Sequence, residues 1–135
     1  MKYLKYLPLL AVVMLASCRL DPAQAYYTNV VIPIDERSIP SASLPGETFS
    51  IYAHATLENE CWSNIRFFFD TLDERNFQLF ALADFSSIGA CPEVLVTSDT
   101  AINLVADEPG TYIIRTWMNA YEFELDSVRV TDVIK

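Results

Sequence analysis

The feature that most constrains the fold of this chain is an alternation of apolar and polar residues with a period of two. It is clearest where Phe49, Ile51, Ala53, Ala55 and Leu57 alternate with Ser50, Tyr52, His54, Thr56 and Glu58. Successive side chains of a β-strand point to opposite faces of a sheet, so this pattern predicts a strand with one buried face. The alternation recurs as far as Val130, and no convincing helical period interrupts it. The sequence therefore predicts an all-β protein.

Short strands of this kind recur along the chain. They are predicted near residues 30–35, 65–70, 77–84, 94–96, 102–104, 112–118 and 123–130. The segment at 30–35 is expected to be an edge strand, because Pro33 has no backbone N–H to donate to a neighbour. Seven or eight short strands in about 105 residues are typical of an antiparallel β-sandwich or a small barrel.

The last strand carries acidic residues next to apolar ones. We expect Phe123 and Leu125 to face inward, and Glu122, Glu124 and Asp126 to face outward with Arg115 as their ion-pair partner. Val128 and Val130 stand in the opposite phase. A bulge near residues 126–127 would account for the change.

The first residues have the charge order and length of a secretory signal peptide. Lys2 and Lys5 precede an apolar run from Leu7 to Ala16. That run is only about ten residues long, whereas a bilayer core of about 30 Å needs about twenty. The segment therefore predicts export of the chain, with a buried N-terminal helix as the alternative.

The residues at the end of this run, Leu15-Ala16-Ser17-Cys18, resemble the lipobox of bacterial lipoproteins. The resemblance implies that residues 1–17 are removed as a signal peptide and that the Cys18 thiol receives a diacylglycerol. Residues 18–27 would then be the lipidated cysteine and a short tether, and residues 28–135 the folded domain. The alternative is an ordinary signal peptide with a coincidental cysteine.

The residue after the cysteine bears on the destination within the cell envelope. In this family, an aspartate at this position favours retention in the inner membrane. Here the residue is Arg19, so the resemblance favours the outer membrane. Some Bacteroidetes lipoproteins carry an acidic run after the cysteine as a signal for export to the cell surface. Here only Asp21 is acidic, so exposure to the periplasm or to the outside stays open.

Charge and cysteine content exclude one class of partner and predict one covalent bond. The 135 residues carry a net charge of −9, which becomes −11 when Lys2 and Lys5 leave with the signal peptide. Such a surface repels nucleic acid, so no nucleic-acid partner is expected. In an oxidising compartment, Cys61 and Cys91 predict a disulfide, with a free buried pair or a redox site as alternatives.

Two short motifs resemble parts of bacterial immunoglobulin-like (Ig-like) and fibronectin-III-like domains. Residues 44–49 (LPGETF) resemble the turn before the second strand. Residues 107–112 (DEPGTY) resemble the corner before the penultimate strand, where a tyrosine hydroxyl bonds back across the loop. The resemblance covers about residues 28–134 and implies an Ig-like antiparallel β-sandwich. Ala53 and Ile114 stand where antibody domains have an inter-sheet cysteine pair, so kinship with antibodies is not implied.

Few residues offer catalytic or cofactor chemistry. The three glycines are far apart and form no phosphate-binding loop, and a single histidine excludes a zinc site built on several, so neither cofactor nor metal is expected. A hydrolase would need His54 with a serine such as Ser50, or a pair of carboxylates. The simpler interpretation is that His54 is a solvated surface residue. We therefore expect that the protein is not an enzyme.

Acidic residues are expected to gather at the end of the domain that holds the disulfide. They are Glu58, Glu60, Asp70, Asp73, Glu74 and Glu93. Their oxygens are of the kind that calcium prefers, but no calcium-binding loop motif is present. A solvated, charged end of the domain is the alternative.

Some apolar residues fall on strand faces where the alternation predicts solvent. They are Phe68, Phe80, Leu82, Ile113 and Trp117. If Phe68, Phe80 and Leu82 lie on adjacent strands, they form a patch beside Tyr52, and exposed apolar patches mark interaction sites. Cover by a loop or by the tether is the alternative.

These observations together favour a membrane-anchored, non-catalytic module of the bacterial envelope. It would be held in the membrane through acylated Cys18 and would bind a protein or glycan partner, or serve as an accessory subunit. A small exported hydrolase and a structural envelope component without a discrete ligand are the alternatives.

Overall fold

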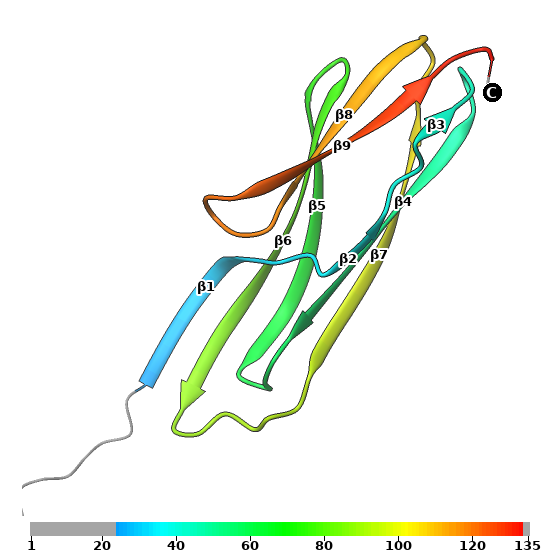
Figure 1. Cartoon of the computed structure of the whole chain (residues 1–135). Helices are drawn as coiled ribbons and strands as arrows, with labels where there is room; N and C mark the ends of the chain where they lie inside the picture. The colour runs from blue at the N-terminus through cyan, green and yellow to red at the C-terminus, as the bar shows by residue number, and fades with distance from the viewer. Residues whose placement is uncertain (1–23, 134–135) are drawn as a thin grey trace, which may run out of the picture.

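The computed structural model describes residues 24–133, which form two β-sheets packed face to face (Figure 1). The strands are β1 (Gln24–Ile32), β2 (Glu36–Ser38), β3 (Ala42–Ser43), β4 (Thr48–Leu57), β5 (Trp62–Asp73), β6 (Asn76–Ile88), β7 (Val96–Val105), β8 (Gly110–Trp117) and β9 (Phe123–Val130). The larger sheet has the order β1-β6-β8-β9-β3, with β5 on the other edge of β6, and the smaller sheet is β2-β4-β7. The predicted all-β sandwich is confirmed.

The first part of the chain is divided between the two sheets, which raises the number of strands to nine. β1 ends at Ile32, directly before Pro33, because proline cannot donate a ladder hydrogen bond. The chain then crosses to the smaller sheet as β2 and returns as β3, which pairs with β9 in parallel. β1 also begins at Gln24, so residues 24–27 of the expected tether are strand, because they pair with β6 from Ile88 to Phe85.

The core lies between the sheets and follows the predicted alternation on the central strands. On β4 the buried residues are Phe49, Ile51, Ala53, Ala55 and Leu57, and on β6 they are Phe77, Leu79, Ala81 and Ala83. Ile114 and Val128 close the core from β8 and β9, and both are fully buried.

β6 is bonded to three other strands. One of its edges pairs with β5 between residues 76 and 85, and the other edge is shared between β8 and β1. β8 runs parallel to β6 and pairs with residues 76–79, whereas β1 runs antiparallel and pairs with residues 81–88. The sandwich therefore contains two parallel pairs, β3–β9 and β6–β8, among its antiparallel ones.

Two strand predictions are corrected by the structure. The expected short strands at 94–96 and 102–104 are not separate: residues 94–95 precede β7, which begins at Val96, includes 102–104, and has the small polar residues Ser98 and Thr100 at inward positions. β7 lies at the edge of the smaller sheet, where its inward side chains are only half-buried, so polar residues are tolerated in the middle. This polar middle made the sequence look interrupted.

The phase of β9 is the second correction. β9 pairs with β8 without a register shift, so no bulge occurs near residue 126. The inward phase of Val128 and Val130 therefore continues back to Asp126 and Glu124, while Phe123 and Leu125 face outward and are 42% and 60% exposed.

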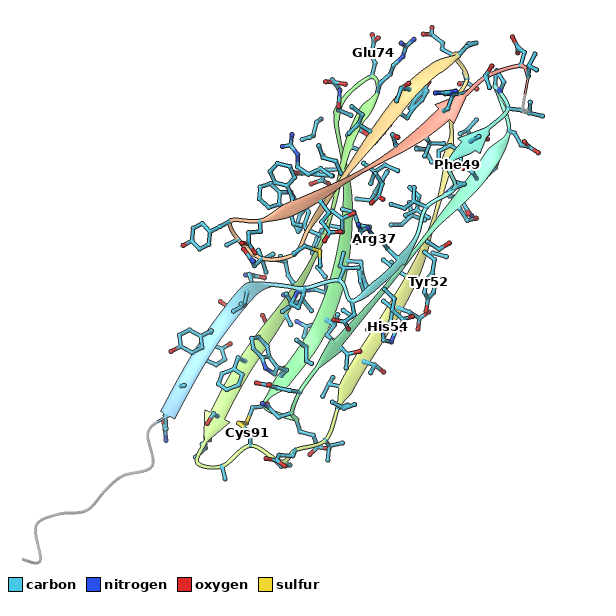
Figure 2. The ribbon with its side chains drawn as sticks, in the orientation of Figure 1. Arg37, Phe49, Tyr52, His54, Glu74 and Cys91 are labelled. Atoms are coloured by element: carbon cyan, nitrogen blue, oxygen red, sulfur yellow. A yellow bond between two sulfur atoms is a disulfide. The ribbon has the colours of Figure 1, made fainter. Side chains whose placement is uncertain are left out.

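The inward carboxylates of β9 are paired by an arginine from the other sheet. Arg37 Nε on β2 donates to Asp126 Oδ2 at 2.7 Å, and its Nη2 pairs with Glu124. Partial burial lowers the pKa of Arg37, but the hydrogen bonds and charges of Asp126 and Glu124 together raise it above its ordinary value. Figure 2 shows Arg37 between the two sheets. Because Glu124 stays largely exposed, we put this ion pair at about 1 kcal/mol.

Both motifs that suggested an Ig-like domain have the expected local structure. Pro45 and Gly46 occupy a turn closed by the Glu47 N–H donating to Leu44 O at 3.2 Å, and Gly46 has a φ of 75° that favours glycine. The Tyr112 hydroxyl donates to Glu108 O at 3.1 Å, four residues upstream, as the tyrosine corner predicts.

The predicted disulfide between Cys61 and Cys91 is confirmed, with 5.4 Å between the Cα atoms. It joins the β4–β5 turn to the loop after β6, at one end of the sandwich.

Reduction of this disulfide is expected to lower the free energy of unfolding by about 3.5 kcal/mol, because the bond closes a loop of 30 residues in the unfolded chain. Urea denaturation of the wild type with and without reductant measures the change. A Cys61→Ser/Cys91→Ser double variant is the control, and reductant should leave its stability unchanged. Equal midpoints for oxidised and reduced wild type would contradict the prediction.

Candidate functional site

The outward surface of the larger sheet carries several apolar side chains, here called the aromatic face. It consists of Val31, Phe68, Phe80, Leu82, Ile113, Trp117, Phe123 and Leu125. β6 supplies its centre, because the residues that alternate with the buried positions of β6 point outward. Phe68 stands directly opposite Phe80 on β5, and Val31 directly opposite Leu82 on β1. The expected juxtaposition of Phe68, Phe80 and Leu82 on adjacent strands is therefore correct.

The two phenylalanines form one stacked unit. The rings of Phe68 and Phe80 lie 5.1 Å apart at an angle of 12°, and Phe68 is 37% exposed. A second unit lies at the other side of β6. There the Trp117 and Phe123 rings meet edge to face at 5.2 Å, with the Arg115 guanidinium 4.5 Å above the Phe123 ring. The expected ion pairs between Arg115 and the acidic residues of β9 are therefore wrong, because Arg115 contacts the Phe123 ring instead.

A pocket of about 270 Å³ opens between these two aromatic units. Its apolar lining residues are Val31, Phe80, Trp117 and Ala120, and its polar ones are Gln78 and Asn119. Two of them are joined, because Trp117 Nε1 donates to Gln78 Oε1 at 3.3 Å. We call this the Trp117 pocket.

The pocket exists because β6 changes its neighbour at this point. The last residue pair with β8 is Leu79–Thr116, and the first with β1 is Ala81–Ile32. Phe80 stands between them, where the edge of β6 has no partner strand. Trp117 and Val31 reach the gap from β8 and β1, and neither side chain fills it.

At one end of the aromatic face, the carboxylate of Asp84 accepts hydrogen bonds from both neighbouring strands, each of which is irregular there. Asp84 Oδ1 accepts the backbone N–H of Asn29 at 2.9 Å, and Asp84 Oδ2 accepts Asn64 Nδ2 at 2.7 Å. Asn29 and Asn64 have positive φ angles of 55° and 57° and lie in bulges of β1 and β5, on either side of β6. Arg66 adds a 3.2 Å contact to Asp84. Left-handed asparagines are tolerated where a local hydrogen bond supports them.

These contacts also affect the acidity of Asp84. The backbone hydrogen bond from Asn29, followed by the bond from Asn64 and the charge of Arg66, holds the pKa of Asp84 below its usual range. The folded state therefore favours the charged form of Asp84, which accepts a hydrogen bond from each of the two bulges.

Tyr52 does not belong to the aromatic face. It lies on β4 of the smaller sheet, directly opposite Ser38 and Ala101, and points away from the larger sheet (Figure 2). The expected patch of Tyr52 with Phe68 is therefore not formed. Alternation along a strand gives the face of a residue but not the sheet to which the strand belongs.

The outward surface of the smaller sheet carries His54 in a row of acidic residues. Glu36 and Asp99 stand directly opposite His54 on the two neighbouring strands, and His54 Nδ1 is 4.0 Å from Asp35 Oδ2. Ser50 is four residues away along β4, about 14 Å in an extended strand, and its hydroxyl donates to Asn103 at 2.7 Å. The structure does not bring Ser50 and His54 together as a nucleophile and its base.

The six acidic residues expected at the disulfide end are divided between two ends of the domain. Glu58, Glu60 and Glu93 lie near Cys91, whereas Asp70, Asp73 and Glu74 lie at the far end of β5 and in its hairpin turn (Figure 2). Asp73 accepts the backbone N–H groups of Arg75 and Asn76, and the bond from Arg75 is the main reason why the pKa of Asp73 is lowered. Among residues 24–133, no three histidine, cysteine or acidic side chains are grouped so that they could hold a metal ion.

No family model, curated protein or solved structure matches this chain. The signal-like segment and Cys18 lie outside the described residues. In the part of the chain that the structure describes, no helix is long and apolar enough to cross a membrane.

Sequence reasoning missed Val31, Phe123 and Leu125 as members of the aromatic face. For β9 a signal was available, since counting back in steps of two from Val130 places 124 and 126 inward and 123 and 125 outward. The Trp117 pocket had no local signal, because it arises where three strands meet on β6.

Asp84→Asn is expected to lower stability at pH 7, and its deficit relative to the wild type should shrink in acid. A depressed folded-state pKa means that the charged form stabilises the fold above the unfolded pKa of about 3.9, and that this stabilisation is lost as pH falls through the folded pKa. Urea denaturation at pH 7, 5 and 3 measures it. Asp99→Asn, an exposed carboxylate on β7, is the control. A deficit that stays constant across this range would contradict the role of Asp84.

Proposed function

We propose that this protein is a lipid-anchored, non-catalytic binding module of the bacterial envelope, and that its aromatic face docks a protein partner. The Trp117 pocket is the observation that carries the proposal. It is a mainly apolar recess of about 270 Å³ on an outward, aromatic sheet surface, with Gln78 and Asn119 as the polar residues of its lining. A protruding apolar side chain of a partner fits this combination, and such pockets hold the anchor residues of protein interfaces.

The surroundings of the pocket support an interface. Phe68, Phe123 and Leu125 are 37%, 42% and 60% exposed, so apolar surface continues on both sides of the recess. Aromatic residues and arginine are enriched where proteins bind each other, and Arg66 and Arg115 lie on the same surface. The outward surface of the smaller sheet offers acidic and hydroxyl side chains around Tyr52.

A protein partner fits this surface better than a glycan. Sugars bind aromatic side chains by stacking on a free ring face, and one face of each of these rings is already occupied: Phe68 and Phe80 stack on each other, and Arg115 lies over Phe123. Binding of a glycan at this face is therefore an outcome that would overturn the choice of partner.

The anchor adds an orientation to the proposal. If Cys18 is acylated, the six residues from it to Gln24 reach at most about 20 Å when extended. Gln24 pairs with Ile88 at the disulfide end of the domain. That end would face the membrane, and the Glu74 turn at the opposite end would point away from it (Figure 2).

Replacement of exposed Phe68, alone or together with half-buried Leu82, is expected to abolish partner capture. The test compares wild type, Phe68→Ser, and Phe68→Ser/Leu82→Ser after crosslinking on intact cells and mass spectrometry. Truncating a residue at the centre of an interface weakens binding by about 30-fold. Tyr52→Ser is the matched control, because Tyr52 is 38% exposed, like Phe68, but lies on the other sheet.

The expected result is a partner recovered with wild type and Tyr52→Ser and lost with both aromatic-face variants, each of them shown to be folded by circular dichroism. Recovery of the same proteins from all four samples would show that the aromatic face is not the docking surface.

The lipid anchor is tested by the mass of the protein from its native host. We expect the mass of residues 18–135 plus acyl groups, and we expect Cys18→Ser to leave the membrane fraction, because acyl chains are the only attachment proposed. The plain mass of residues 18–135 would contradict acylation.

A further inference from the structure

A second pocket, of about 530 Å³, lies on the outward surface of the larger sheet where β3, β8 and β9 meet. Its lining combines one arginine, Arg129, with four hydroxyl-bearing residues, Ser41, Thr111, Ser127 and Thr131, and with two apolar residues, Ala42 and Val133. Thr111 stands directly opposite Arg129 on β8, and the Arg129 N–H donates to Ser41 O at 2.9 Å, which joins the three strands. We call this the Arg129 pocket.

The charge of Arg129 is not used inside the domain. Of the five basic residues in the described chain, Arg37 pairs with Glu124 and Asp126, Arg66 with Asp84, Arg75 with Glu108, and Arg115 lies over Phe123. Arg129 forms no ion pair with any residue that the structure describes, although the whole chain carries 18 acidic residues. An exposed cation is thus kept apart from the acidic groups of an acidic protein and is surrounded by neutral hydroxyls.

We propose that the Arg129 pocket binds an acidic saccharide, that is, a sugar unit carrying a carboxylate or a phosphate. The guanidinium presents forked N–H donors that match the oxygens of either anion. Serine and threonine hydroxyls donate and accept hydrogen bonds, which suits the hydroxyl groups of a sugar ring.

The size of the pocket selects the saccharide over a bare anion. Small-molecule sites have volumes of about 300–1,000 Å³, and about 530 Å³ lies within that range. A single phosphate would contact Arg129 but would leave most of the hydroxyls to water. Both the charged and the neutral parts of the lining are used only by a ligand that has an anion and several hydroxyls.

This inference uses residues different from those of the aromatic face, so the two proposals stand or fall separately. The full-length chain with Cys18→Ser is titrated in a calorimeter with glucuronate, glucose 6-phosphate, glucose and inorganic phosphate. We expect binding of the two acidic sugars, and at least tenfold weaker binding of glucose and of phosphate, because each lacks half of the required contacts.

Two variants assign the binding to the pocket. Arg129→Gln is expected to weaken binding of the acidic sugars at least tenfold, since a hydrogen-bonded ion pair is lost. Thr111→Val, which removes one hydroxyl at nearly constant shape, should weaken it about threefold to tenfold. Thr97→Val, which removes an exposed hydroxyl on β7 of the smaller sheet, is the control and should leave the affinity unchanged.

Absence of binding to both acidic sugars would overturn the proposal. So would acidic-sugar affinities that neither Arg129→Gln nor Thr111→Val changes, or phosphate binding as tightly as glucose 6-phosphate, which would indicate a simple anion contact.

Discussion

β6 is bonded to three other strands, and the rest of the structure depends on how its second edge is shared. β8 occupies that edge up to Leu79 and β1 occupies it from Ala81, so on this edge one residue, Phe80, has no partner strand. The Trp117 pocket is the direct consequence of this change of partner. Asp84 supports the arrangement farther along, because it holds the bulges that let β1 and β5 follow β6 on both sides.

A second constraint acts through β9. Its uninterrupted register turns Glu124 and Asp126 toward the inside of the sandwich, where two carboxylates would repel each other. Arg37 on β2 of the opposite sheet reduces this repulsion by pairing with both carboxylates. The short β2 strand therefore connects the two sheets through an ion pair. The same register turns Phe123 and Leu125 outward, which extends the apolar surface beside the Trp117 pocket.

The sequence predicted what depends on local pattern. Alternation on β4 and β6 identified nine buried residues, the two remaining cysteines indicated the disulfide, and the DEPGTY motif indicated the Tyr112 hydrogen bond. It could not predict which sheet a strand joins, so Tyr52 was expected beside Phe68 although the two lie on different layers. The parallel β6–β8 pair and both pockets arise from contacts between distant segments, and no local pattern encodes those contacts. In β9 the apolar character of Phe123 and Leu125 suggested burial more strongly than the phase of the strand did.

The β8–β9 hairpin contributes to both proposed sites. Trp117 and Phe123 stand opposite each other near its loop, and Thr111 and Arg129 stand opposite each other six residues away, about 20 Å in extended strands. The two sites therefore share a rigid element and one surface, but no side chain. The outward residues between the two sites lie on the same paired strands. They are Ile113 and Arg115 on β8, and Leu125 and Ser127 on β9. A partner docked on the aromatic face can therefore extend toward the Arg129 pocket without a change in the fold. The larger sheet thus combines an apolar recess and an unpaired cation on one side of the domain, and the smaller sheet leaves acidic groups on the other.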